Sequence, residues 1–189
     1  MKTYTVLHRL LHWVFALGIL VLLTTGFLRM YWMGKEAISE AVTKDLQIQA
    51  LNLDQQSLGS IIHSILDPMF EWHVYSAYLI TFAFVARIIY MIVKGIKFPN
   101  PFLKNTPNKE KFQGFIYLAF YFLIAVEIIT GGILKFKIGT ESLANLAETV
   151  HKLAVYWTPI FILLHFAGVA ISENTTGKGI TSKMIGGHP

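Results

Sequence analysis

The chain has 189 residues, of which 54% are hydrophobic and only 14% are charged. Soluble domains carry about 25% charged residues, so this composition excludes an ordinary soluble fold. The sequence contains no cysteine. Iron–sulfur clusters held by cysteine, thioether-attached cofactors and disulfide bonds within this chain are therefore excluded.

The hydrophobic residues gather in four runs, each close to the roughly 18–20 residues that cross a bilayer. We place the spanning helices at about 10–28, 74–93, 112–134 and 153–172. The predicted fold class is an all-α integral membrane protein, a four-helix transmembrane bundle that forms a single domain over residues 1–189. The first run lacks a small-residue cleavage site and has the length of a full span, so we expect it to be a helix of the protein and not a signal peptide.

The net charge of +5 is unevenly distributed. Lysine and arginine exceed acidic residues at the two termini, including the tail 173–189, and in the loop 94–111. Most acidic residues lie in the segments 29–73 and 135–150. Because basic residues mark the cytoplasmic side, we predict both termini and the loop 94–111 inside, and the segments 29–73 and 135–150 outside. The basic surplus indicates topology, and we expect no nucleic-acid partner. The basic residues on the inner side are Lys2, Arg9, Lys94, Lys97, Lys104, Lys109, Lys111, Lys178 and Lys183.

Two segments outside the spans have local patterns of their own. In "LGSIIHSILDPMF", within the outer segment, apolar residues recur at helical spacing, which predicts an interfacial helix broken near Pro68. The last spanning helix should begin at about Thr149, and the simplest effect of Pro159 is a kink within it. The glycine- and threonine-rich tail "ENTTGKGITSKMIGGHP" predicts a loosely ordered segment.

Four of the seven histidines lie within or at the edge of the spans. The direction of each helix places His12 at the inner level and His73 at the outer level. His151 is also outer, and His165 lies fourteen residues deeper in the same run. Fourteen helical residues correspond to about 21 Å of rise and fall about 40° short of four turns. His151 and His165 are therefore expected on one helix face, at opposite sides of the membrane.

The histidines thus form two pairs at separate depths, His12 with His165 and His73 with His151. One histidine alone could be an ordinary hydrogen-bonding residue, but buried ionisable residues in a membrane are usually functional. A zinc or copper site would gather its ligands in one place. Two separated pairs instead predict bis-histidine ligation of two stacked haems inside the bundle.

Other polar residues of the spans have two interpretations each. Arg87 and Arg9 could pair with haem propionates or extend to the inner headgroups. His8, one turn before His12, could approach a propionate or a quinone headgroup, or be an ordinary interfacial histidine. Glu127 should be protonated or hydrogen-bonded; it could relay a proton to a quinone or bond a nearby serine, threonine or histidine.

The runs "HRLLHWVFALGILVLLTTGF", "HVYSAYLITFAFVARIIY" and "ETVHKLAVYWTPIFILLHFAGVAISE" resemble the bacterial cytochrome b561 family, which includes the b-type subunits of nickel–iron hydrogenases. The resemblance implies two haem b groups, the same four ligands (His12, His73, His151 and His165) and a place in the cytoplasmic membrane. Where the family often has glycine four residues after the second-span histidine, this chain has Ala77. The long outer segment favours docking of a periplasmic redox protein: a hydrogenase, another reductase or a cytochrome c.

The predicted function is that of a di-haem b cytochrome, surrounded by membrane lipid, that transfers electrons between a periplasmic redox partner and the quinone pool. Quinone would be its mobile substrate, and a quinone-reductase or quinol-oxidase activity of its own is left open, as is a homodimer. One alternative is a self-contained superoxide:quinone oxidoreductase, which would need a cationic outer funnel. The other is a non-redox transporter or structural subunit, whose polar residues would cluster around one central site.

Overall fold

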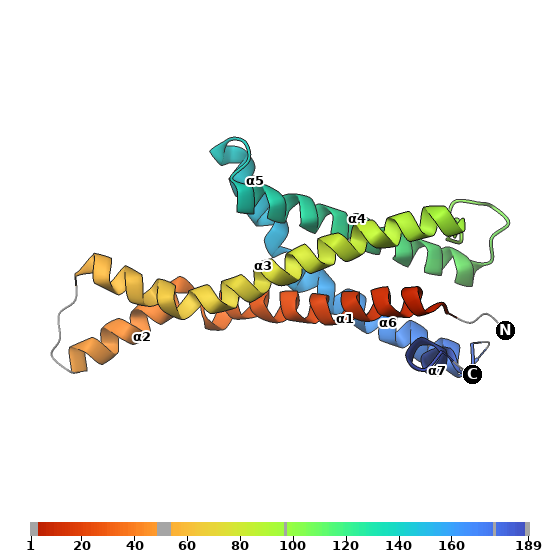
Figure 1. The fold of residues 1–189 in the computed structure, drawn as a ribbon, viewed down its shortest axis with the longest axis horizontal. Helices are drawn as coiled ribbons and strands as arrows, with labels where there is room; N and C mark the ends of the chain where they lie inside the picture. Colours follow the sequence, from red (N-terminus) through yellow and green to blue (C-terminus); the bar gives the residue numbers. More distant parts are fainter. Residues whose placement is uncertain (1–3, 49–53, 97, 176, 188–189) are drawn as a thin grey trace. The chain divides into compact units, whose positions relative to one another are not determined.

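A computed structural model describes residues 4–48, 54–96, 98–175 and 177–187. The predicted inner residues Lys2 and Lys97 lie outside these ranges. Every regular element within them is a helix, so the all-helical fold class is confirmed (Figure 1). The elements are α1 (Val6–Phe27), the π-helix η1 (Leu28–Trp32), α2 (Lys35–Ile48), α3 (Gln55–Lys94), α4 (Asn108–Phe136), α5 (Glu141–Lys152), α6 (Ala154–Glu173) and α7 (Ile180–Ile185).

Four helical stretches of the described chain are long and apolar enough to cross a membrane, which agrees with the predicted number of spans. They are Val6–Trp32, Gln55–Lys94, Glu110–Phe136 and Glu141–Glu173. Large apolar side chains along them are exposed, among them Phe82, Ile92 and Leu163. Lipid chains, which are as apolar as these side chains, are the surroundings in which such a surface is stable.

The chain divides into two compact units, Phe15–Ile80 and Met1–Val14 with Thr81–Pro189. The first unit holds the later part of α1, η1, α2 and the beginning of α3. The second holds the beginning of α1, the end of α3 and α4 to α7. The single domain over the whole chain stays a prediction.

In the first unit, the predicted break near Pro68 is wrong, because α3 continues through this residue. Proline removes one backbone hydrogen bond, yet the apolar stripe continues on the same helix face, where Ile62 and Leu66 are both buried. The segment predicted as a separate interfacial helix therefore forms the beginning of α3. Close packing of α1 on α3 occurs at Gly18, where an added Cβ would lie 2.7 Å from Cδ1 of Ile80.

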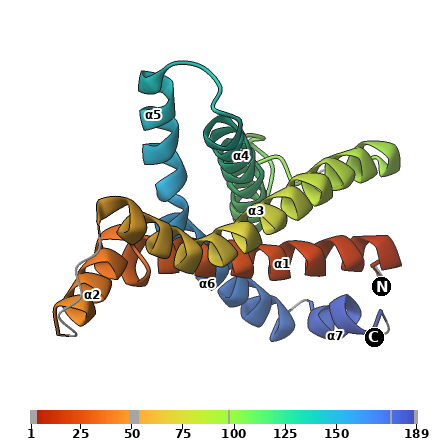
Figure 2. The same cartoon turned by 60° about the vertical axis from the view of Figure 1, so that its left-hand side comes forward.

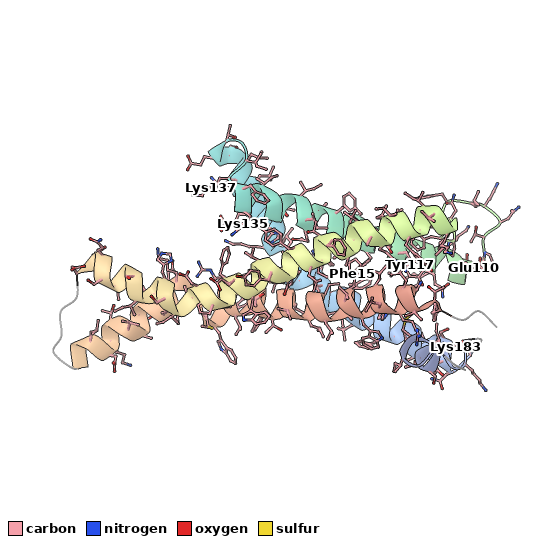
Figure 3. The ribbon with its side chains drawn as sticks, viewed as in Figure 1. Phe15, Glu110, Tyr117, Lys135, Lys137 and Lys183 are labelled. Atoms are coloured by element: carbon pink, nitrogen blue, oxygen red, sulfur yellow. The ribbon has the colours of Figure 1, made fainter. Side chains whose placement is uncertain are left out.

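In the second unit, a short turn joins α4 to α5. Lys137 ends α4 in a left-handed conformation with φ of 53°, and Gly139 follows with φ of 87°. Thr140 then caps α5 by accepting a hydrogen bond from the backbone N–H of Leu143 at 3.3 Å. Figure 3 shows Lys135 and Lys137 at this end of α4, opposite Glu110 at its beginning. The turn brings α5 back against the last part of α4.

The last predicted span, 153–172, corresponds to α6, but the helix predicted to begin at about Thr149 is interrupted at Leu153, which forms a turn between α5 and α6. The carbonyl of Leu153 accepts bonds from the N–H groups of both Tyr156, at 3.0 Å, and Trp157, at 3.2 Å. Pro159 lies inside α6, where it has no N–H for the carbonyl four residues earlier. The assumption of one uninterrupted helix from His151 to His165 is therefore wrong, and their relative direction depends on this turn.

The described part of the tail, residues 173–175 and 177–187, contains the helix α7, which corrects the prediction of a loosely ordered segment. The carboxylate of Glu173 accepts bonds from the N–H groups of Gly179, at 2.6 Å, and Thr181, at 3.1 Å, and so holds the first turn of α7. At the other end of α7, Trp13 Nε1 donates to the carbonyl of Met184 at 3.3 Å. Figure 2 shows α7 as a short helix after α6.

A pair of glycines on α4 provides a test of this packing. An added Cβ at Gly114 would collide with the backbone carbonyl of Pro99, whereas at Gly132 it would meet no atom within 4 Å. Gly114→Ala should therefore destabilise the protein by about 1–3 kcal/mol. Gly132→Ala should be neutral or stabilise by up to about 1 kcal/mol through helix propensity. Thermal unfolding in detergent, followed by circular dichroism, measures both; equal midpoints would contradict the packing at Gly114.

Candidate functional site

The predicted inner pair of histidines lies together in the second unit. His12 on α1 and His165 on α6 have ring centres 6.0 Å apart with planes inclined by 41°. Both side chains are half-buried. The ring of Phe161 stacks near that of His165 at 6.0 Å, and Phe120 of α4 stacks on Phe161 at 4.5 Å. An aromatic layer therefore lies beside the two imidazoles.

The spacing of these rings would allow both histidines to bind one metal. Bonds from a metal to histidine nitrogen are about 2 Å long and each ring centre lies about 1 Å beyond the nitrogen, so two such rings are about 6 Å apart. No three histidine, aspartate or glutamate side chains of the described residues gather as a metal site. A haem needs only two ligands from the protein, because its porphyrin supplies the other four.

Arg9, for which the sequence left a haem propionate and the inner headgroups as possible partners, binds the tail through one nitrogen. Its Nη1 donates to the carbonyl of Ile185 at 3.1 Å. Its Nε is buried and has no hydrogen-bond partner among the described residues. Buried polar groups are nearly always paired, so an acceptor from a bound group, such as a propionate, fits this nitrogen.

Arg87 is held by other residues of the second unit. Its Nε donates to the hydroxyl of Tyr121 at 3.2 Å, and its Nη1 lies 2.9 Å from Nδ1 of His8. Arginine has only donors, so Nδ1 of His8 must accept and the proton of that ring is on Nε2. The ring of Tyr90 lies 5.8 Å from the guanidinium carbon. The sequence predicted roles for Arg87 and His8 separately, and the structure joins them.

His73 lies in the first unit, where a threonine of α1 fixes its ring. Thr25 Oγ1 is 2.8 Å from His73 Nδ1 and 2.8 Å from the carbonyl of Val21. A hydroxyl has one proton, which Thr25 donates to that carbonyl, so its oxygen accepts from Nδ1–H of the histidine. This assignment places the lone pair of His73 on Nε2, the nitrogen that an iron would bind.

His151, in the last turn of α5, is contacted in the same way by α4. Thr130 Oγ1 is 3.1 Å from His151 Nδ1 and 2.8 Å from the carbonyl of Val126. The next residue, Gly131, lets the ring approach, since an added Cβ there would lie 3.2 Å from Cε1 of His151. Glu127 joins this group: its Oε2 lies 2.9 Å from His151 Nδ1. Of the two roles considered for Glu127, contact with a histidine is the one observed.

Sequence reasoning missed the two threonines as partners of the histidines. The signal was available in the related endings "LTTGFL" and "IITGGIL", where a Thr-Gly pair recurs near the ends of two spans. Both Thr25 and Thr130 are buried. Small residues at these positions are explained equally well by helix packing, so the pattern alone does not identify a hydrogen bond to histidine.

The fold and the site together define a class of protein. It is a helical membrane protein with several spans, whose histidines lie close together or contact threonine hydroxyls in a way that suits haem binding. The family model for prokaryotic cytochrome b561 matches residues 3–187, and the chain belongs to this family. It is accordingly a membrane electron-transfer cytochrome that binds haem b. No curated protein and no solved structure gives a match to the chain.

Thr25 offers a test of the hydrogen bond to His73. Thr25→Val removes the acceptor for Nδ1–H while keeping the side-chain shape, and loss of such a partner weakens metal-centre binding about 10–100-fold. We expect the purified variant to retain less haem b, measured from the absorbance of the reduced protein per chain. Thr25→Ser keeps the hydroxyl and should retain the wild-type amount. Equal haem content in both variants would contradict the assigned role of Thr25.

Proposed function

We propose that this protein is a di-haem b cytochrome that carries electrons between a periplasmic redox protein and the quinone pool. One haem would be bound by His12 and His165, the other by His73 and His151. The observation that supports the proposal best is the 6.0 Å separation of the His12 and His165 rings. When bound, each haem supplies an iron that accepts and releases one electron.

The chain's own residues would hold and orient these groups. Thr25 and Thr130 keep the proton of each outer histidine on Nδ1, so that each ring presents Nε2 to iron. The buried Nε of Arg9 is suited to the negative charge of a propionate. We propose Arg87 as the second cationic group for the inner haem, since His8 and Tyr121 hold its guanidinium in a fixed position.

We propose His8 as the residue that meets the quinone headgroup on the inner side. Arg87 keeps the proton of His8 on Nε2, and this N–H can donate to a quinone carbonyl. The ring of Tyr4 stacks on His8 at 4.9 Å, which adds an aromatic wall to the same place. Glu127 contacts His151, so any proton that Glu127 transfers would be exchanged with that histidine.

The proposed setting is the bacterial inner membrane, with both termini in the cytoplasm, based on the asymmetry of lysine and arginine. The partner would then meet the outer segment. Here α2 and α3 form an open groove with mixed charge, which suits a polar protein surface rather than lipid. The groove is lined by Lys35, Glu36, Ser39, Glu40, Thr43, Lys44 and Ile62.

The alternatives receive less support. A superoxide:quinone oxidoreductase needs unpaired positive charge at its outer mouth, but Lys152, one of the outer lysines, forms an ion pair with Glu148 at 2.6 Å. A non-redox transporter or structural subunit disagrees with membership of a family of electron-transfer cytochromes. Electron transfer from a partner protein therefore remains our proposal.

Single replacements of the histidines test the haem assignment. The wild-type protein should contain two low-spin b haems per chain. His12→Ala or His165→Ala should remove one, and His73→Ala or His151→Ala the other, because a low-spin haem needs both axial ligands. His63→Ala is the control, because His63 is not one of the four proposed ligands. The side chain of His63 is exposed, and it lies 3.9 Å from Asp67 of the same helix. Unchanged haem content in the four variants would overturn the assignment.

A separate replacement tests the quinone contact. His8→Ala should leave two haems per chain but lower the affinity for quinol about tenfold, the effect of losing one hydrogen bond of about 1.4 kcal/mol. The measurement is the rate of haem reduction by a water-soluble quinol at several concentrations. His63→Ala again serves as the control. If His8→Ala and wild type respond alike across the concentration range, His8 does not contact the quinone.

A further inference from the structure

The carboxyl group of Glu127 is fixed between two aromatic nitrogens of the second unit. Trp157 Nε1 on α6 donates to Glu127 Oε1 at 3.1 Å. The other oxygen, Oε2, lies 2.9 Å from Nδ1 of His151. The side chain of Glu127 is only 15% exposed, and Oε2 itself is buried. A carboxylate in this position interacts strongly with its neighbours, because water does not screen it.

The contact between Oε2 and His151 is electrostatic in character. Oε2 has no hydrogen bond of good geometry among the described residues, although its distance to Nδ1 is short. The N–H of His151 is directed at Thr130 Oγ1, at 3.1 Å, and this threonine donates its own proton to Val126. Thr130 therefore fixes the position of the imidazole proton, and Glu127 places negative charge beside it.

Negative charge next to Nδ1 has a defined effect on a histidine that binds metal through Nε2. It raises the basicity of the ligand nitrogen, and a more basic ligand favours the more highly charged state of the metal. For a b-type haem that state is ferric, so the midpoint potential falls. The interruption at Leu153 contributes to this geometry, because it separates His151 on α5 from Trp157 on α6.

We infer that Glu127 is a positioning residue for the outer haem, which acts through His151 to lower the midpoint potential of that haem. Trp157 holds the carboxylate in place, and Thr130 orients the imidazole. This inference rests on the proposed function in one respect, that His151 is an axial ligand. It adds to that proposal a named residue that sets the difference in potential between the two haems.

The test is a spectroelectrochemical titration of the purified full-length protein in detergent. Glu127→Gln keeps the size of the side chain and removes its charge. The variant should retain two haems per chain and raise the midpoint potential of one of them by about 59 mV. For a one-electron couple, this shift changes the ratio of oxidised to reduced haem about tenfold at a fixed potential. The other haem should be unchanged. Glu127→Asp, which keeps the charge, should restore part of the shift.

Glu148→Gln is the matched control, because Glu148 also lies on an outer helix but is exposed and paired with Lys152. It removes one negative charge that is exposed to solvent and already paired, and it should not move either potential. Two haems with unchanged potentials in Glu127→Gln, or an equal shift in Glu148→Gln, would overturn the inference. Failure of the proposed function is seen separately, as a wild-type protein without two haems or a His151→Ala variant that keeps both.

A second variant tests the inference if Glu127→Gln cannot be purified as a folded protein. Trp157→Phe keeps Glu127, Thr130 and His151 but removes the N–H that fixes Oε1. It should shift the same haem in the same direction by a smaller amount. An unchanged potential in Trp157→Phe would then overturn the inference by itself.

Discussion

The structure depends on how imidazole rings are accommodated in an apolar helical protein. A polar ring that leaves water must have its N–H paired, or burial is unfavourable by several kcal/mol. Buried threonines provide this pairing for His73 and His151, and each threonine in turn donates to a carbonyl of its own helix. The same bonds decide which nitrogen carries the proton. Folding requirements and ligand chemistry are thus met by one set of contacts.

Two groups of polar residues in the second unit differ in composition. Around Arg87 the partners are His8 and Tyr121, which are suited to binding anions and neutral headgroups. Around His151 the partners are Thr130 and Glu127, which place a hydroxyl and a carboxyl group beside the imidazole that we propose as a haem ligand. The proposed transfer of electrons between two haems would use this difference in polarity.

Two departures from regular helix contribute to this arrangement. The turn at Leu153 separates α5 from α6, so that His151 faces Thr130 while Trp157 reaches Glu127. The carboxylate of Glu173 holds the first turn of α7, and the tail then supplies carbonyl acceptors to Arg9 and Trp13. The last carbonyls of a helix have no partner within it, so those of α7 are available to these two side chains. Each departure links elements that lie apart in the sequence.

The sequence by itself determined the helical class and the number of spans, because hydropathy depends only on residue order. From helical rise it also predicted two histidine pairs, of which the structure brings His12 and His165 together. It did not determine where helices break: Pro68 suggested a break that does not occur, and the break at Leu153 has no proline or glycine beside it. Only the tertiary structure decided that Thr25 and Thr130 bind histidines and that Glu127 lies beside His151. Those pairings depend on how helices rotate against one another, and that rotation follows from packing between residues far apart in the chain.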